Sequence, residues 1–273
     1  MKEIGLEELK VLQKEMLFKI HDFCQANGIR YTMIAGTLLG AVRHKGYIPW
    51  DDDIDIAMPR PDYNRFLNLF NGSTDHLYVI APEINWNFYA PYANVCDDRT
   101  IVREGANSHR GLDMGIKIDV FPIDGVPDDF DEFWRNLKKI QRINNILFCK
   151  RYLLHKMRIT NIYSVIRLTR MMLDRLKTSF CSYSTYQKEL HKIATSYPYQ
   201  DSKFATTWVY TSIYDRYDKT MFENYTTLEF EGRKLCAVED YDQWLRKAHG
   251  DYMQLPPEKQ RIPHHHFTAY WKD

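Results

Sequence analysis

Hydrophobic and polar residues alternate with two different periods in the first half of the chain. Up to residue 23 the apolar residues return every three or four positions, which is the spacing of one face of a helix. They are Leu6, Leu9, Leu12, Met16, Ile20 and Phe23. This spacing predicts an amphipathic helix over 6–26 that ends near Gly28. A short strand is then expected over 30–36, followed by a helix over 37–44 with Thr37 as its N-terminal cap.

From residue 53 the period changes to two, which is typical of a strand. In the strand predicted over 53–58, two aspartates alternate with two isoleucines before Ala57 and Met58, and the prolines at 59 and 61 are expected to end the strand. A helix over 62–70 follows. Further strands are predicted over 77–81, 92–96 and 115–121, and the last of these has the clearest alternation.

The second half has a different pattern. Residues 129–178 are expected to be mostly helical with breaks near Arg158, and the stretch 228–238 predicts a hairpin that turns around Gly232. A helix over 240–250 and a proline-rich tail follow. The fold class is therefore α/β with α+β character: a short mixed sheet flanked by helices. We divide the chain into a core over 1–128, a helical section over 129–200, and a C-terminal part over 201–273 that completes the core domain.

Composition narrows the class of protein. Of the 273 residues, 44% are hydrophobic and 14% aromatic, as in a packed globular protein and unlike a disordered chain. No apolar run approaches the ~20 residues of a membrane span, and the first ten residues lack the apolar core of a secretory signal. The five cysteines are scattered without a CxxC pair, which favours reduced thiols in the cytoplasm over a zinc knuckle or a disulfide framework.

Charge is distributed unevenly. The net charge is only +1, yet the stretch from Arg135 to Lys177 holds twelve lysines and arginines against one acid, Asp174. The remainder of the chain therefore sums to −10, since the basic stretch contributes +11. Such a section favours a negatively charged partner: a polymer with phosphates, a nucleic acid or the anionic face of a membrane. A solvated pair of basic helices is the alternative that the charge count leaves open.

Four aspartates, at 51, 52, 53 and 55, stand before and within the first alternating strand. Residues two apart on a strand share a face, so Asp53 and Asp55 project together while Ile54 and Ile56 enter the core. Two adjacent carboxylates repel unless a cation neutralises them, and Mg²⁺ or Mn²⁺ binds through such oxygen ligands. We therefore interpret Asp53 and Asp55 as a metal-binding pair, and Asp51 and Asp52 as a solvated turn.

Asp119 has the same setting, a carboxylate between apolar residues of an alternating strand. If the two strands are neighbours, three carboxylates converge, as in sites where two metals clamp a phosphoryl transfer. A calcium-binding EF-hand loop is excluded, because its sixth position needs glycine and holds Ile56, and its twelfth holds Asp62 in place of glutamate.

The segment before the aspartates has features of an anion site. A strand that stops at Gly36 and enters a helix exposes backbone N–H groups at the helix N-terminus, and the hydroxyl of Thr37 adds a donor. Arg43, His44 and Lys45 follow on the same connection and are suited to neutralise a diphosphate. The histidines at 264–266 receive little weight as metal ligands, because neighbouring residues of an extended segment point in opposite directions.

With these residues in view, the chain resembles the LicD family, the phosphocholine-transferase-like branch of the nucleotidyltransferase fold. The stretch GTLLGAVRHKGYIPWDDDIDIAM (36–58) is similar to the family signature over its whole length. IKIDVFPIDGVP (116–127) resembles the second block, and HGDYMQLPPEKQR (249–261) the closing one. Relatives commonly have a second glycine where this chain has Ala35. A pair of glycines suits a turn that needs positive φ, and alanine adopts positive φ only at a cost. We therefore expect Gly36 alone to have positive φ in this turn.

The resemblance implies a nucleotidyltransferase-like core in which Asp53, Asp55 and Asp119 bind Mg²⁺ or Mn²⁺ and carry catalysis. Gly36 and Thr37 would hold phosphate. The implied reaction moves phosphocholine, or a related phospho-alcohol such as ribitol phosphate, from a CDP-alcohol to a hydroxyl of a cell-surface glycan. Teichoic acid and lipopolysaccharide are such glycans, and CMP is the leaving product.

Further expectations concern the partners. Choline's quaternary ammonium favours an aromatic face, and Trp50 is the first candidate, with Trp86, Tyr89 and Tyr92 as others. The basic section is suited to an anionic or lipid-linked glycan acceptor, or to the inner surface of the membrane, and no nucleic acid is expected. Two alternatives remain: a nucleotidyltransferase that releases pyrophosphate, and a non-catalytic binder of an anionic polymer.

Overall fold

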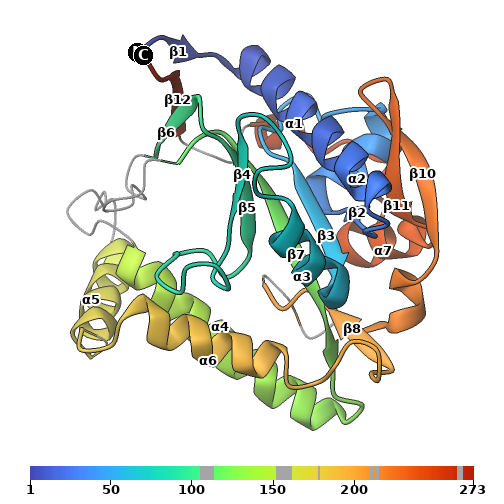
Figure 1. The fold of residues 1–273 in the computed structure, drawn as a ribbon. Helices are drawn as coiled ribbons and strands as arrows, with labels where there is room; N and C mark the ends of the chain where they lie inside the picture. The colour runs from blue at the N-terminus through green and yellow to red at the C-terminus, as the bar shows by residue number, and fades with distance from the viewer. Residues whose placement is uncertain (105–113, 152–161, 178, 210–211, 213–214, 263–266) are drawn as a thin grey trace.

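A mixed sheet flanked by helices forms the centre of the protein, as a computed structural model shows (Figure 1). The structure describes all residues except 105–113, 152–161, 178, 210–211, 213–214 and 263–266. The histidines at 264–266 and the expected helix break near Arg158 lie outside the described residues. Strand order in the main path of the sheet is β2-β3-β7-β5-β4.

Only one neighbouring pair along this path is parallel, and it lies at the centre. β3 (Asp55–Pro59) runs parallel to β7 (Lys117–Val126), while β2 (Thr32–Met33), β5 (Ala93–Asp97) and β4 (Leu77–Ile80) join by antiparallel pairing. The far half of the long strand β7 pairs with β8 (Phe204–Thr206), which pairs in turn with β9 (Tyr217–Asp218). Residues after 200 therefore extend the same sheet.

The N-terminal helices pack on the central strands. They are α1 (Leu6–Ala26), α2 (Ala35–His44) and α3 (Arg60–Leu69). Leu17 and Ile20 of α1 are fully buried in the largest apolar cluster, together with Ile56 of β3 and Ile118 of β7. Most of the apolar positions that predict these elements from the sequence thus meet in the core, although Leu6 at the start of α1 is exposed.

Two smaller antiparallel units flank the central sheet. β1 (Glu3–Ile4), β12 (Phe267–Trp271) and β6 (Thr100–Glu104) form a three-stranded sheet that brings the two ends of the chain together (Figure 1). β10 (Tyr225–Phe230) and β11 (Arg233–Val238) form the hairpin expected around Gly232, which has φ +80°. The short 3₁₀ segments Lys219–Phe222 and Glu258–Gln260 and helix α7 (Tyr241–His249) complete this part.

The basic section is a separate group of helices beside the sheet (Figure 1). α4 (Phe130–Arg151) packs against both α5 (Ile162–Lys177) and α6 (Tyr183–Ala194). Its buried face, with Phe133, Leu137 and Ile140, belongs to an apolar cluster of its own that also contains Val126 and Trp208. No helix among the described residues has the length and apolar content that crossing a bilayer demands.

At the carboxyl ends of β3 and β7 a buried group of charges joins three elements. The Arg60 guanidinium contacts Asp124 at 2.6 Å and Glu83 at 2.9 Å, and Glu83 lies 3.3 Å from Nδ1 of His191 on α6. Burial alone lowers the pKa of Arg60, but the two carboxylates raise it above its ordinary value. Both carboxylates contact the guanidinium, and this attraction offsets part of the cost of burying the charges.

The α+β fold with a short mixed sheet is confirmed, and several boundaries differ from the expected ones. β3 begins at Asp55 and includes Pro59, so Asp53 precedes the strand, and α3 begins at Arg60 in place of residue 62. β6, β12 and α6 were not predicted. The two edge strands β6 and β12 find their partners far away in sequence, because Thr100–Glu104 pairs with Phe267–Trp271, and local alternation carries no information on such pairing.

Candidate active site and metal centre

Asp55 and Asp119 stand side by side at the amino ends of the two parallel strands. The register pairs Asp55 of β3 with Asp119 of β7, and Asp119 in turn with Asn94 of the antiparallel strand β5. Residues in direct register share one face of a sheet. The three side chains therefore form a row across three adjacent strands, and the expected adjacency of the two acidic strands is present.

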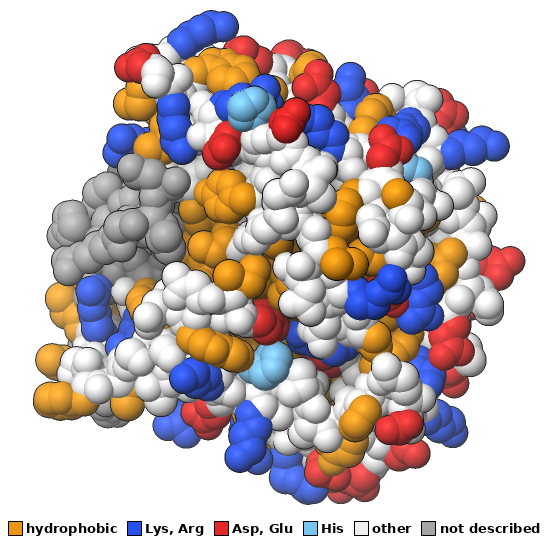
Figure 2. All heavy atoms as spheres, viewed as in Figure 1, with side chains coloured by type: hydrophobic (Ala, Val, Ile, Leu, Met, Phe, Trp, Pro, Cys, Tyr) orange, Lys and Arg blue, Asp and Glu red, His pale blue; other side chains and the backbone are white. Residues whose placement is uncertain are grey.

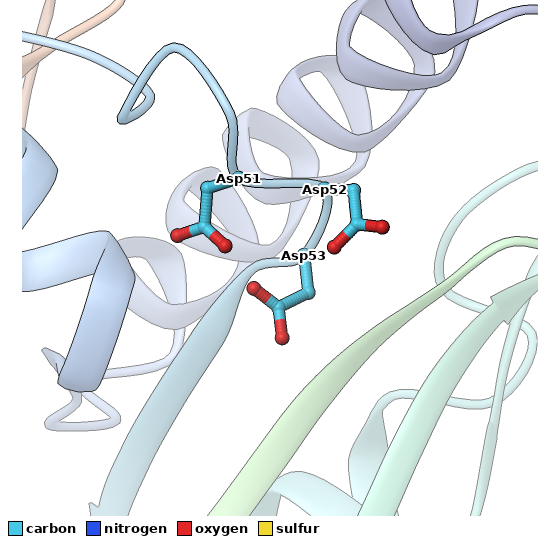
Figure 3. A group of neighbouring side chains, drawn as sticks. All are labelled: Asp51, Asp52 and Asp53. Carbon is cyan, nitrogen blue, oxygen red and sulfur yellow. The ribbon is translucent and has the colours of Figure 1, made fainter. Parts of the chain in front are cut away.

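Asp51, Asp52 and Asp53 lie in the loop that leads into β3 (Figure 3). Each has an oxygen atom within 4.8 Å of one from both of the others. Asp51 and Asp52 are buried, with 8% and 4% of their surfaces exposed, so the interpretation of these two residues as a solvated turn is wrong. The turn lies under α1, whose Gln13 donates from Nε2 to the backbone oxygen of Asp52 at 3.2 Å.

Burial and the nearness of several carboxylates raise the pKa values of two of these aspartates. Burial, and then the charge of Asp53, raises the pKa of Asp51 to about 7. Burial also raises the pKa of Asp55 well above its ordinary value, and the charges of Asp53 and Asp119 add to this effect while Lys117 opposes it. Carboxylates in this condition either retain a proton or bind a cation. The donors are all hard oxygen atoms, so the residues present fit Mg²⁺ or Mn²⁺.

Asp119 is held by two residues that the sequence analysis did not identify. Lys117 Nζ lies 2.5 Å from Oδ1 of Asp119, and Nδ2 of Asn94 donates to the same oxygen at 2.6 Å. Asn94 is fully buried, and within the part of the chain that the structure describes its Oδ1 receives no hydrogen bond. An amide oxygen is a hard ligand of the kind that Mg²⁺ and Ca²⁺ accept.

One of these two residues had a signal in the sequence. Lys117 precedes Asp119 by two positions in an alternating strand, so the period alone places both side chains on one face. Asn94 had no such signal, because it meets Asp119 only through antiparallel pairing of β5 with β7.

Gly36 and Thr37 lie in the first turn of α2, whose cap is Ile34. The expectation that Thr37 caps this helix is wrong, because its Oγ1 instead accepts a hydrogen bond from the backbone N–H of Asp55 at 2.8 Å. Thr37 is 4% exposed. Its hydroxyl thus ties the start of α2 to the start of β3 and fixes Asp55 relative to the helix.

Positive φ occurs at Ala35, with φ +47°, and the expectation that Gly36 alone would meet this demand is wrong. Glycine is required at 36 for a different reason: a Cβ atom there would lie 2.3 Å from Oδ2 of Asp51. The carboxylate of Asp51 therefore lies directly against the first turn of α2. A non-glycine residue at positive φ is strained, and such strain gathers at functional sites.

Arg43, His44 and Lys45 at the end of α2 contact the C-terminal third of the chain. Arg43 donates to the backbone oxygens of Tyr252 at 2.7 Å and Gln254 at 3.3 Å, and its Nε lies 3.1 Å from Nε2 of His44. Burial, with Arg43 as the second cause, lowers the pKa of His44. These contacts join the segment 36–58 to the segment 249–261.

Lys45 ends α2 in the left-handed conformation, with φ +62°, and its backbone oxygen accepts from the N–H of Glu231 at 2.8 Å. This contact anchors the β10–β11 hairpin at the end of α2.

Trp50 is in contact with a cationic side chain. The guanidinium carbon of Arg261 lies 5.7 Å from the ring centroid of Trp50, and His44 meets the ring edge to face with centroids 6.3 Å apart. The other aromatic candidates differ in exposure. Tyr89 and Tyr92 are buried, Tyr92 packs on Phe121 with ring centroids 4.2 Å apart, and the Trp86 ring meets His191 and Lys188.

Residues 28–160 match the model of the LicD/FKTN/FKRP nucleotidyltransferase domain family. Over 99% of its length the chain is 31% identical to the lipopolysaccharide cholinephosphotransferase LicD of Haemophilus influenzae, and the alignment covers 99% of that protein. The chain belongs to the LicD family.

Two shorter similarities accompany this full-length match. An uncharacterized protein of Rickettsia typhi is 44% identical over 66 residues, or 24% of this chain and 21% of that protein. An uncharacterized protein of Rickettsia prowazekii is 44% identical over 62 residues, or 22% of this chain and 23% of that protein. The match with the Haemophilus protein therefore covers nearly the whole chain, whereas these two matches cover about a quarter of it.

Proposed function

We propose that this LicD-family protein is a metal-dependent transferase. It moves phosphocholine, or a related phospho-alcohol, from a CDP-alcohol to a hydroxyl of a cell-surface glycan such as lipopolysaccharide or teichoic acid. The similarity to the Haemophilus cholinephosphotransferase over 99% of both chains supports the choline donor and the lipopolysaccharide acceptor. The observation that carries the proposal is the register of Asp55 beside Asp119 on parallel strands, with Asp53 at the entrance to the first.

In the proposed reaction the acceptor hydroxyl oxygen forms a bond to the phosphorus that bears choline. The bond from this phosphorus to the bridging oxygen of the diphosphate breaks, CMP leaves with the bonding electrons, and the hydroxyl proton is released to a base. Asp53, Asp55 and Asp119 would hold Mg²⁺ or Mn²⁺ as ligands. When bound, the metal supplies charge stabilisation at the phosphate oxygens.

The protein's own residues orient this reaction. Lys117 and Asn94 each donate a short hydrogen bond to Oδ1 of Asp119. These two bonds hold the Asp119 carboxylate in place beside Asp55. The hydroxyl of Thr37 fixes the backbone of Asp55. Gly36 and Thr37 are proposed to line the phosphate side, where the first turn of α2 presents its N–H groups.

Arg43, His44 and Lys45 are proposed to contact the donor diphosphate, and Trp50 the choline head group. Arg43 and His44 lie beside the Tyr252–Gln254 segment, which brings the closing block next to them. Trp50 already faces the Arg261 guanidinium, and a quaternary ammonium favours the same aromatic face.

The test is an assay of products. Purified protein is incubated with Mg²⁺, a panel of CDP-alcohols and lipopolysaccharide or teichoic acid, and CMP release and labelled glycan are measured. We expect CMP and phosphocholine-labelled glycan from CDP-choline. Silence across the panel together with pyrophosphate release from nucleoside triphosphates would establish the nucleotidyltransferase alternative, and unchanged function of Asp53→Ala would establish the non-catalytic one.

A further inference from the structure

Helix α5 carries a stripe of exposed apolar side chains on the face that is turned away from the protein. Seven of the eighteen exposed large hydrophobic residues of the described chain lie between 162 and 180, within this helix or just after it. They are Ile162, Val165, Ile166, Met172, Leu173, Leu176 and Phe180, with exposures from 39% at Val165 to 98% at Phe180. Intervals of three and four residues place them on one side of the helix.

The opposite side of α5 makes the contacts with the fold. Met171 is buried, Leu168 and Arg175 are half-buried, and α5 packs against α4. At 100° per residue these three positions lie roughly opposite to Ile162, Ile166 and Leu173. The apolar stripe is therefore additional to the face that α5 needs for packing. Figure 1 shows α5 at the outer edge of the molecule, and Figure 2 shows hydrophobic side chains at the same edge.

Charge identifies the occupant of this surface. The stretch from Arg135 to Lys177 contributes +11, and Arg135, Lys138, Lys139 and Arg142 of α4 are exposed. A second copy of the chain would bring an equal positive charge to the interface, which opposes self-association. An anionic lipid surface offers both complements, since acyl chains accept the apolar stripe and head groups attract the basic residues.

We propose that α5 is an interfacial helix that docks the protein on the anionic surface of a lipid bilayer. The helix lies in the plane of the interface, since no described helix meets the requirements of a membrane span. This inference rests on the proposed function, because an acceptor glycan that carries or is built on a lipid gives the docking its purpose. The apolar part of the docking surface consists of α5 residues and Phe180, the exposed basic residues are on α4, and neither part includes Asp53, Asp55 or Asp119.

The experiment is co-sedimentation of the full-length protein with vesicles. Vesicles of phosphatidylcholine are compared with vesicles of an equimolar mixture of phosphatidylcholine and phosphatidylglycerol. We expect strong binding to the anionic vesicles, weak binding to the neutral ones, and a decrease of binding as salt is raised. The double variant Leu173→Glu/Leu176→Glu is expected to bind the anionic vesicles more weakly, by at least about tenfold for each substituted side chain. The reason is that burial of one leucine side chain in the bilayer strengthens binding by at least about tenfold.

Leu69→Glu is the matched control, because Leu69 on α3 is 48% exposed and Leu173 is 50% exposed. It is expected to bind vesicles as the wild type does, and circular dichroism checks that both variants are folded. Absence of binding to anionic vesicles, or equal loss in Leu69→Glu and in the α5 variant, would overturn the proposal. So would a wild-type dimer that the α5 variant converts to a monomer without any change in vesicle binding.

Activity separates this inference from the proposed function. With CDP-choline and a water-soluble acceptor fragment, the α5 variant is expected to release CMP at the wild-type rate. With the acceptor presented in anionic vesicles, it is expected to be slower in proportion to its lost binding. If the wild type binds vesicles but no CDP-alcohol yields CMP, the docking stands and the proposed function fails. If CMP is released but vesicle binding is absent, the reverse holds.

Discussion

The two parallel strands β3 and β7 carry acidic residues at both ends, and the two ends differ in how the charge is neutralised. At the carboxyl ends, Asp124 and Glu83 share the Arg60 guanidinium at 2.6 and 2.9 Å. At the amino ends, Asp55 and Asp119 adjoin three further aspartates, and the Lys117 ammonium contacts Asp119 at 2.5 Å.

The pKa values follow this difference. Burial raises the pKa of Glu83, but the hydrogen bond from His191 and the charge of Arg60 outweigh it, so that the net shift is downward. At the other end, burial and neighbouring carboxylates raise the pKa of both Asp51 and Asp55. Carboxylates that share a guanidinium support the fold, whereas a cluster of neighbouring carboxylates stores repulsion that a ligand can relieve. The comparison therefore separates a structural site from a functional one on the same two strands.

The largest expected effect is on activity at the amino end. Asp55→Asn is expected to lower CMP release by at least about 100-fold, because a metal ligand contributes several kcal/mol of charge stabilisation to the transition state. The thermal unfolding temperature is expected to stay unchanged or rise, since a buried repulsion is removed. If Asp55→Asn keeps its activity, Asp55 has a structural role, as Asp124 and Glu83 do, and is not a metal ligand.

Asp124→Asn at the other end of the same pair of strands is the matched control for Asp55→Asn. It removes one of the two carboxylates that contact the buried Arg60 guanidinium, so we expect lower stability together with activity in the fraction that remains folded. Equal stability losses in both variants would contradict the distinction between the two ends.

Arg60→Met is expected to destabilise the protein by about 3–5 kcal/mol, because it leaves Asp124 and Glu83 buried without their cation. Urea unfolding at constant pH measures this change. Arg65→Met on the same helix is the control, since Arg65 is exposed, donates to the backbone oxygens of Asn27 and Gly28, and has one longer ion pair, at 3.8 Å to Asp62. Similar decreases in the free energy of unfolding in both variants would show that the Arg60 ion pairs contribute no more to stability than the surface contacts of Arg65.

Asn94→Leu and Lys117→Met are expected to lower metal affinity or activity by about 10- to 100-fold, as other residues that orient metal ligands do. Titration of Mn²⁺ followed by its electron paramagnetic resonance signal measures the affinity without turnover. Gln187→Met removes another buried amide, which donates to the backbone oxygens of Phe88 and Ala90, and is expected to cost stability while metal affinity is kept. Wild-type affinity in both test variants would remove Asn94 and Lys117 from the site.

The smallest effect concerns pH and stability. The pKa of Asp51 is about 7 in the folded protein and about 4 in an unfolded chain, so the folded state binds more protons between these values. Stability of the metal-free protein is therefore expected to fall as pH rises from about 4 to about 7. Mg²⁺ relieves this penalty, and a concentration near 100 times its dissociation constant adds about 2.7 kcal/mol.

Differential scanning fluorimetry at pH 5 and pH 8, with and without Mg²⁺, measures this effect. We expect the larger rise in unfolding temperature at pH 8, because protons compete with the metal at pH 5. Equal rises at the two pH values would contradict a metal held by carboxylates of raised pKa.

Much of the candidate site is visible in local pattern. Alternation over 53–58 and 115–121 places Asp55 and Asp119 on strands, and the expected strands, β3 and β7, are present. Predictions from local pattern were wrong for residues whose burial or hydrogen-bond partner depends on distant segments of the chain. Asp51 and Asp52 resemble a polar turn in sequence, but α1 covers them. Thr37 resembles a helix cap, but the N–H of Asp55 competes for its hydroxyl.

The sequence by itself determined the periodic elements, the acidic strand and the family, because these depend on residues that are near one another in the chain. Only the tertiary structure decided which carboxylates meet a cation and which meet one another. Asp119 meets Asp55 across a parallel pair 64 positions apart, Asn94 joins them from an antiparallel strand, and Arg60 meets Asp124 at the opposite end. Neutralisation of a buried charge depends on distance in space, and strand pairing sets that distance.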